Sequence, residues 1–292
     1  MNRELTRRSF AQILGAGAAL SARAQSGMTA AQVVERIKKQ LAAEGVVWGP
    51  SAFDGFHLGD PNVLVTGVAT TFQPTLNVLQ RAAAANKNLV VCHESTYWDG
   101  FEPVESLRND LVCQAKIRFA EQRKMAVWRI HDHWHRCKPD PIFIGLARKL
   151  KWDNYYDSES RPRHYTIPEM SLEEVARHIQ RNLGTQNVVV VGDRNLRVKT
   201  IGDCAHVLSS VLPALRTYDV ALVGETLQHD TFEYLRDAVA LGMKKGVVMI
   251  SHEALEEWGM ETFAGWLQPL VPDVPVQWIG TGDPFLIPAI RT

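Results

Sequence analysis

Short runs rich in β-branched residues alternate along this chain with longer segments of helical periodicity. Continuous apolar runs of this length are typical of strands covered on both faces, as in an α/β sheet. The alternation therefore predicts an α/β fold with helices flanking the sheets. The predicted strands are Val63–Ala69, Leu89–His93, Ala126–His131, Val188–Gly192, Val220–Gly224 and Val247–Ser251.

Helical patterns fill segments between these runs, at Thr75–Ala85, Ser171–Asn182 and Thr231–Leu241. Ser171 is followed three residues later by Glu174, the spacing of a capping box, which marks the start of the second helix. Both observations favour helices between the strands, as an α/β fold requires.

A polar, aromatic and irregular stretch begins at about Lys151 and interrupts the alternation. We interpret residues 151–185 as a connector between two lobes. The prediction is an N-terminal α/β lobe at residues 25–150 and a C-terminal α/β lobe at residues 186–292, each with a mixed sheet flanked by helices.

The first 24 residues have the parts of an export signal. The pair Arg7-Arg8 precedes a weakly apolar run at residues 11–20, and Ala22-Arg23-Ala24 supplies the small residues of a cleavage site. Adjacent arginines indicate the twin-arginine route, so we expect a periplasmic or extracellular protein. The run is shorter than the ~20 residues of a membrane helix. We therefore expect no membrane span in the mature chain.

The composition of the chain limits the classes of partner that it can bind. Lys and Arg total 32, Asp and Glu total 32, and the formal net charge is zero. Domains that bind nucleic acid usually carry a basic patch, so we expect a small-molecule partner and no nucleic acid. The four cysteines form no CxxC pair, which argues against a structural zinc knuckle.

Polar residues close several of the predicted strands. His93-Glu94 ends the second run, His131–His135 ends the third, Glu225 follows the fifth and His252 follows the sixth. In open α/β sheets ligands bind outside the carboxyl ends of the strands. This pattern predicts a site in a cleft at those strand ends.

Imidazoles and carboxylates together suit Zn, Mn, Fe or Ni, so we expect one or two divalent metal ions per chain. His252 and Glu256 are four residues apart and share one helix face if the helix begins directly after the strand. His93 and Glu94 lie where the chain turns, so their side chains need not diverge. These four residues are the first candidate metal ligands.

The segment after the third run offers His131, His133 and His135 at alternate positions. In an extended segment two or three of these imidazoles point the same way and can bind metal. The alternative is a solvated surface loop. Glu225 is a candidate to orient a ligating imidazole. His229 is a further ligand, a general acid/base, or a histidine on a helix surface.

Taken together, the motifs resemble the NIF3-like family of dinuclear metal proteins, also labelled GTP cyclohydrolase 1 type 2 homologs. The resemblance covers residues 52–266 in the family order. It rests on Asp54–Pro61, similar to D-N-x-G-L-x-x-G-D; Leu89–Trp98, similar to an apolar strand ending in H-H-P; Ile130–His135, where the family has H-T-N-L-D; Gly224–Asp230, similar to G-D/E-x-x-x-H-D/H; and Ser251–Glu256, similar to G-H-x-x-x-E.

The resemblance implies a two-lobe α/β fold that assembles as a homo-oligomer, a toroidal hexamer with metal sites facing an internal cavity. It implies His93, His252 and Glu256 as ligands and puts Glu94 in place of a second histidine. The family's bridging aspartate falls near His135. Glu94 can supply the bridge instead, or the site holds one metal.

Two classes of function follow. The first is a metal-dependent hydrolase that uses a metal-activated water on a small molecule, with Glu225 or His229 moving the proton. The alternative is a non-catalytic metal-binding or carrier protein, or a scaffold. A catalytic site keeps an open coordination position and a storage site does not, so the sequence leaves both hypotheses standing.

Overall fold

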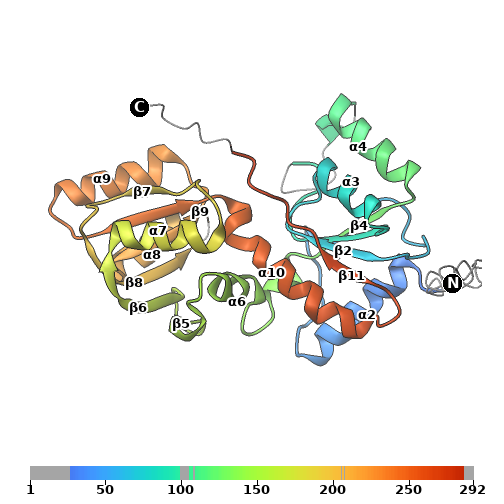
Figure 1. Cartoon of the computed structure of the whole chain (residues 1–292), viewed down its shortest axis with the longest axis horizontal. Coiled ribbons are helices and arrows are strands. Elements are labelled where there is room, and N and C mark those ends of the chain that lie inside the picture. The colour runs from blue at the N-terminus through green and yellow to red at the C-terminus, as the bar shows by residue number, and fades with distance from the viewer. Residues whose placement is uncertain (1–26, 99–104, 108, 205, 207, 286–292) are drawn as a thin grey trace, which may run out of the picture.

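Two α/β lobes lie beside one another in the computed structural model, and the long helix α10 (His252–Leu267) joins them (Figure 1). The structure describes residues 27–98, 105–107, 109–204, 206 and 208–285. The expected export signal at residues 1–24 lies outside them. Within the described ranges, no helix has both the length and the apolar character needed to cross a membrane. The predicted α/β class is confirmed.

The first sheet is mixed and contains β1 (Gly55–Leu58), β2 (Val68–Thr71), β3 (Leu89–Cys92), β4 (Ala126–Arg129) and β11 (Val276–Trp278). Its strand order is β1-β4-β3-β2-β11, and β1 is antiparallel to β4 while the others run parallel. Cys92 at the end of β3 pairs with Arg129 at the end of β4. The residues that follow these two strands therefore meet at one edge.

The second sheet contains β5 (Tyr156–Asp157), β6 (His164–Ser171), β7 (Val189–Val191), β8 (Arg197–Cys204), β9 (Val220–Gly224) and β10 (Gly246–Ile250). Its order is β5-β6-β8-β9-β10-β7, with β8, β9 and β10 parallel. Val223 pairs with Cys204 on one side and Met249 on the other. The carboxyl ends of three strands thus lie together at one edge of this sheet.

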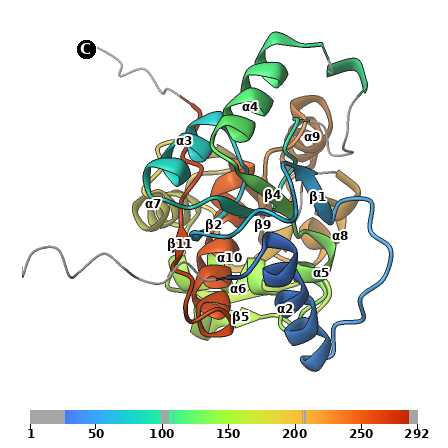
Figure 2. The ribbon, with the colours of Figure 1, turned by 90° about the vertical axis from the view of Figure 1, so that its right-hand side faces the viewer.

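Helices cover both faces of each sheet. Beside α10, these are α2 (Ala30–Ala43), α3 (Leu76–Ala84), α4 (Leu111–Gln122), α5 (Asp132–His135), α6 (Pro141–Lys149), α7 (Leu172–Leu183), α8 (Leu208–Thr217) and α9 (Glu233–Ala240). In the first lobe α3 and α4 cover one face and α2 the other (Figure 2). In the second lobe α8 and α9 cover one face and α7 the other. The predicted capping box of Ser171 and Glu174 begins α7.

The structure differs from the expected lobe boundaries in two places. Residues 151–185 are not a connector, because they contain β5, β6 and α7 and form part of the second lobe. In β6 only alternate residues such as Tyr165 and Ile167 are buried, so this strand lacks the continuous apolar run that marks the others. The chain also returns at the end, and β11 joins the first sheet beside β2.

Helices α6 and α10 cross at very close range. A Cβ atom on Gly145 of α6 would lie 2.5 Å from the backbone of Trp258, and one on Gly259 of α10 would lie 2.5 Å from Cα of Ile142. Only glycine allows this separation. The crossing fixes α10 against α6, and it lies within an apolar cluster that is continuous through both lobes.

Replacing Gly145 with alanine should therefore destabilise the protein. The added methyl group meets backbone atoms that cannot rotate away, and overpacking of this kind costs about 1–3 kcal/mol. Gly265→Ala is the matched control, because Gly265 is an exposed glycine of α10 with open space around it and alanine favours helix by up to about 1 kcal/mol. Urea unfolding measures both. Equal midpoints for the two variants would contradict the close packing.

Candidate metal centre

The ends of strands from both sheets converge on one cluster of histidines and carboxylates. His93 and Glu94 follow β3, and His131 follows β4 two residues after its last paired residue. His252 begins α10 directly after β10, and Glu256 lies one helical turn further on. The strand-end prediction therefore brings together residues from both lobes.

Glu256 lies at the centre of the cluster and is almost fully buried, with 3% exposure. Its Oε2 atom is 3.2 Å from Nε2 of His93 and 3.1 Å from Nε2 of His252, and its Oε1 atom is 3.6 Å from Nε2 of His206. Within the described part of the chain, neither Oε2 of Glu256 nor Nε2 of His93 has a partner in hydrogen-bonding geometry. Buried atoms left in this way are costly, and a cation between them would satisfy both.

Glu94 is the second carboxylate of the cluster. Its Oε1 atom lies 3.7 Å from Nε2 of His131 and 3.9 Å from Nε2 of His252. Its Oε2 atom accepts a hydrogen bond of 2.8 Å from the buried Arg129, which also donates to the backbone oxygen of His93 at 2.9 Å. Arg129 thus fixes one oxygen of Glu94 and leaves the other facing two imidazoles.

Each imidazole of the cluster uses its Nδ1 atom to bond an oxygen on the side away from the centre. A neutral imidazole that donates from Nδ1 keeps the lone pair on Nε2, which is the form that binds metal. The five pairs are His93 with the Ile130 carbonyl at 3.3 Å, His131 with Asp132 at 3.0 Å, His135 with Asp140 at 2.9 Å, His206 with the Gly224 carbonyl at 2.6 Å and His252 with Glu225 at 3.3 Å.

These side chains form three overlapping groups whose potential ligand atoms lie within 4.8 Å of one another. Two of the groups share His93 and two share Glu256, so the cluster has room for ions on either side of these shared residues. The groups are His93, His131 and His135; His206, His252 and Glu256; and His93, Glu94 and Glu256.

The three histidines at alternate positions are not in an extended segment. Asp54 accepts hydrogen bonds from successive backbone N–H groups at the start of α5, including those of Asp132 at 3.1 Å and His133 at 3.0 Å, and this begins a helical turn. Residues four apart share a helix face, so His131 and His135 point into the cluster together.

The structure does not bring His133 into the cluster. It lies on the opposite side of α5, fully buried, with its ring stacked on Trp48 at 3.7 Å. Its Nδ1 atom bonds Asp54, and its Nε2 atom accepts from the backbone N–H of Gly49 at 3.1 Å. Both ring nitrogens are therefore engaged in packing the first lobe.

Glu225 is brought to the cluster as the sequence suggested, with Oε1 3.3 Å from Nδ1 of His252. Its φ of 31° is positive, which is strained for a residue other than glycine. Its side chain is 64% exposed and so stands at the open side of the centre. His229 is exposed on the short π-helix Gln228–Phe232, and the structure does not bring it to this group.

His206 was not among the predicted ligands. It follows β8, in which polar and charged residues interrupt the apolar ones, whereas the prediction used only continuous apolar runs. Had this strand been recognised, the same strand-end argument would have found this histidine.

The side chains of the cluster differ in their charge at neutral pH. Burial, with the imidazoles of His93 and His135, lowers the pKa of His131 to about 4, so this ring is neutral at neutral pH. Burial also lowers the pKa of His252, but Glu225 and Glu256 outweigh it and raise that pKa to about 10. Burial raises the pKa of Glu256, yet the surrounding imidazoles hold it well below its usual range. Without metal the centre therefore holds a buried carboxylate–imidazolium pair.

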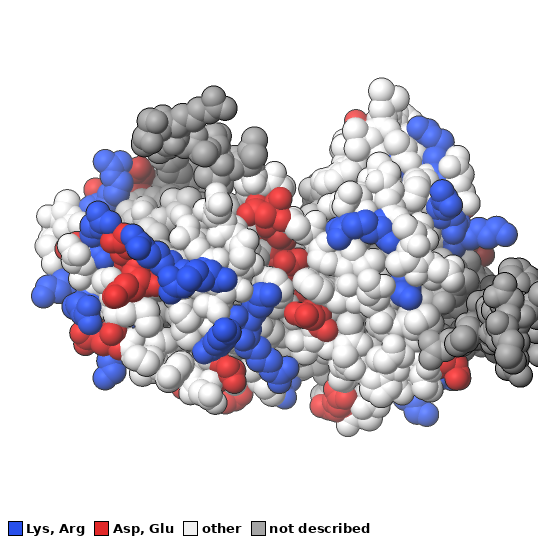
Figure 3. All heavy atoms as spheres, in the orientation of Figure 1, with Lys and Arg blue, Asp and Glu red and all other residues white. Residues whose placement is uncertain are grey.

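Charged side chains are unevenly distributed over the face of the molecule in Figure 3. On the face in Figure 3, acidic side chains gather at the junction of the two lobes, over α10, and basic side chains lie to either side.

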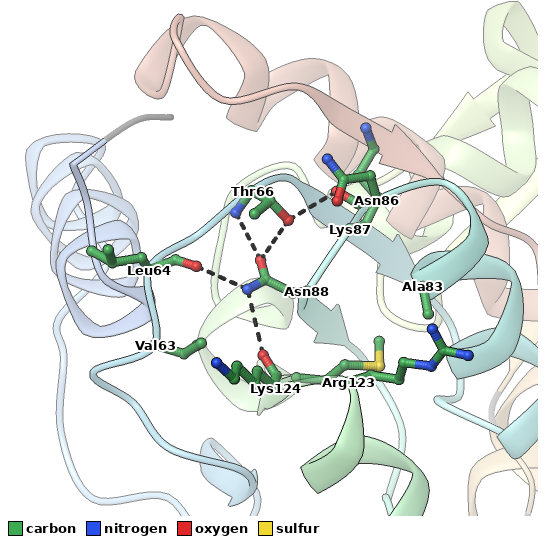
Figure 4. Close-up of a pocket in the computed structure, with 10 residues that line it drawn as sticks. Val63, Leu64, Thr66, Ala83, Asn86, Lys87, Asn88, Arg123 and Lys124 are labelled. Atoms are coloured by element: carbon green, nitrogen blue, oxygen red, sulfur yellow. Dashed lines mark hydrogen bonds between the residues drawn. The ribbon is translucent and has the colours of Figure 1, made fainter. Parts of the chain in front are cut away.

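A cavity of about 500 Å³ lies away from the metal centre, at the opposite edge of the first sheet (Figure 4). There Asn88 bonds the carbonyl of Leu64 and the N–H of Thr66, both at 2.8 Å. Lys87 and Arg123 follow the ends of α3 and α4. Basic residues there complement the helix dipoles, which gives these two side chains a structural role.

Comparison with known proteins agrees with the fold. A family model described as Duf34/NIF3 (NGG1p interacting factor 3) matches residues 28–282. Protein SA1388 of Staphylococcus aureus is 20% identical, with a TM-score of 0.68 over 90% of this chain and 100% of its own. A Bacillus cereus protein related to NIF3 is 14% identical, with a TM-score of 0.68 over 89% and 99%. Reduced HcgD from Methanocaldococcus jannaschii is 18% identical, with a TM-score of 0.62 over 86% and 97%.

At these identities the structural likenesses show the fold alone. No curated protein matched the chain. The family that the motifs predicted, and its two-lobe α/β fold, are confirmed by the family match and by these structures.

Metal affinity should rise with pH. The pKa of His252 is about 10 without metal, so at neutral pH a cation must displace one proton from this ring. Below that pKa, displacement of one proton makes the affinity rise about tenfold per pH unit. Chelator competition between about pH 6 and pH 9 measures the slope. A wild-type affinity that does not change over this pH range would contradict the assignment.

Asp140→Asn should weaken metal binding by about 10- to 100-fold, the usual effect of losing a carboxylate behind a ligating imidazole. Asparagine at this position still caps α6 through Oδ1, which accepts from the N–H of Ile142, but an amide in place of Oδ2 no longer accepts from His135. Asp110→Asn makes the same change at the N-cap of α4, away from the centre. Metal affinity that falls equally in both variants would rule out a specific role for Asp140.

Proposed function

The chain belongs to the Duf34/NIF3 family, and we propose that it is a metal-dependent hydrolase that acts on a small molecule at this centre. One observation carries the proposal. Five imidazoles each bond an oxygen through Nδ1 on the outer side, and they surround two carboxylates with their remaining nitrogens. In this arrangement Nε2 of His93 and Oε2 of Glu256 are buried and lack a well-formed hydrogen bond among the described residues, and a cation between them would satisfy both.

The donor set fits a divalent transition metal. Nitrogen and carboxylate oxygen ligands suit Zn, Mn, Fe or Ni, whereas Ca and Mg prefer oxygen alone. His131 and His135 group with His93, and His206 and His252 group with Glu256. We propose that these groups would hold two ions per chain, with Glu256 and Glu94 as the two carboxylates. Glu94 would thereby supply the carboxylate that the family resemblance assigns to an aspartate.

When bound, such ions lower the pKa of a coordinated water and polarise a carbonyl or phosphoryl oxygen. The chain's own residues do the rest. Glu225 stands at the open side with one oxygen on His252, and interaction with that imidazole lowers the pKa of its carboxyl group. It is therefore ionised at neutral pH and can accept a proton from the attacking water. Arg129 and Asp140 hold Glu94 and His135 in place.

A second candidate function is metal storage or transport without catalysis. The number of ligand atoms favours this function if the metal is zinc. The five imidazoles, the two oxygens of Glu256 and the one oxygen of Glu94 that Arg129 leaves free offer eight ligand atoms. Two tetrahedral zinc ions need about eight, which would close the site. Two six-coordinate ions need about twelve, which leaves positions for water and substrate. Hydrolysis is thus expected with Mn, Fe or Ni rather than with tetrahedral zinc.

The proposal includes export by the twin-arginine-type signal at residues 1–24 and assembly as a homo-oligomer. The first is supported by the order of its sequence features and the second by the family. Neither changes the proposed ligands, which all come from one chain.

Elemental analysis joined to a screen of phosphoester and amide substrates tests the function. Wild type is expected to hold two ions per chain and to hydrolyse at least one substrate class. His93→Gln and His252→Ala should lose most of the metal and the activity, because each removes an Nε2 ligand. His229→Ala is the control, since that exposed residue lies outside the cluster and should leave the metal content unchanged. Full metal content in both ligand variants would refute the site, and activity that survives metal removal would refute hydrolysis by it.

A further inference from the structure

A positively charged side chain stands beside the metal centre with unused hydrogen-bonding capacity. Arg163, just before β6, has its Nη1 atom 3.8 Å from Oδ2 of Asp140, and this same oxygen bonds Nδ1 of His135 at 2.9 Å. The guanidinium is thus separated from a candidate ligand by one carboxylate oxygen. Its side chain is 24% exposed, so a bound molecule can reach it.

The hydrogen bonds of this guanidinium are incomplete among the described residues. Its Nε atom is buried and has no partner. Asp140 cannot serve it fully, because Oδ1 of Asp140 accepts from Ile142 and Oδ2 from His135. Asp203 is 97% buried and lies close by, with its N–H donating to the carbonyl of Arg163 at 2.9 Å, yet its Oδ1 atom also lacks a partner. A guanidinium has five donors, and here most of them are unused.

Arg129, a second arginine beside the centre, has a structural role, and its hydrogen bonds can be compared with those of Arg163. It is buried, and it donates to Glu94 at 2.8 Å and to the carbonyl of His93 at 2.9 Å. Arg163 instead lies against the ring of Phe143, 3.7 Å from its centre, and its side chain stays partly exposed. An arginine stacked on an aromatic ring with a free edge is well suited to bind an oxyanion.

We propose that Arg163 is a specificity-determining residue that binds an oxyanion, phosphate or carboxylate, of the molecule held at the metal centre. The assignment rests on the proposed function and narrows it. The substrate carries an anionic group some distance from the bond that is hydrolysed, and the guanidinium binds that group while the metal centre acts on the bond. A neutral substrate would leave Nε of Arg163 without a hydrogen bond among the described residues.

Calorimetric titration of the metal-loaded full chain with inorganic phosphate, and separately with acetate, tests this assignment. Arg163→Met should weaken the binding of at least one probe by about tenfold or more, because a hydrogen bond to a charged group is lost. Arg163→Lys should recover part of the affinity, since it keeps the charge but not the planar pair of donors. Arg161→Met is the matched control. Arg161 lies on the same loop and bonds only the carbonyls of Ser158 and Ser160.

Equal affinity of wild type and Arg163→Met for both probes would overturn the assignment and leave the anions bound by the metal alone. Wild type that holds metal but binds neither probe would also overturn it. Loss of metal from Arg163→Met would show that Arg163 supports Asp140 and is not a recognition residue. Wild type without metal would refute the proposed function itself, which the metal content measured before each titration distinguishes from the other outcomes.

Discussion

The buried carboxylate of Glu256 is the group on which the rest of the centre depends. A charge at this depth costs several kcal/mol unless neighbouring groups compensate it. Here compensation comes from imidazoles on three different elements: His93 after β3, His206 after β8 and His252 at the start of α10. The carboxylate therefore contacts residues that follow strands of both sheets.

That position is set by α10, the one helix that runs through both lobes (Figure 1). Its first turn carries His252 and Glu256, while its middle packs against α6 through Gly145 and Gly259. The two helices lie almost backbone to backbone, so α10 has little freedom to shift along its axis. Tight packing some distance from the centre thus fixes the direction of the two side chains on which the centre is built.

Around this fixed pair the chain arranges supporting groups in a second layer. Arg129 holds Glu94, while Asp132, Asp140 and Glu225 each hold one imidazole. These contacts select the ring nitrogen that faces the centre, so the geometry exists before any cation arrives. Arg163 is the member of this layer whose donors are not used up, and for this reason it is the one that we assign to an external ligand.

The sequence by itself determined the fold class, the family and those ligands whose positions depend on local structure. His93 and Glu94 follow a strand made wholly of apolar residues, and His252 and Glu256 are spaced to share one helix face, so their placement needs only neighbouring residues. Tertiary structure decided the rest. Asp54 accepts hydrogen bonds from backbone N–H groups and so starts a helical turn at His131–His135. In this turn His131 and His135 point into the cluster, and His133 lies in the core. His206 follows β8 and Arg163 precedes β6, and neither strand is a continuous apolar run, so a search for such runs misses both. Side-chain direction at such places depends on contacts between residues tens of positions apart, and no local pattern records those contacts.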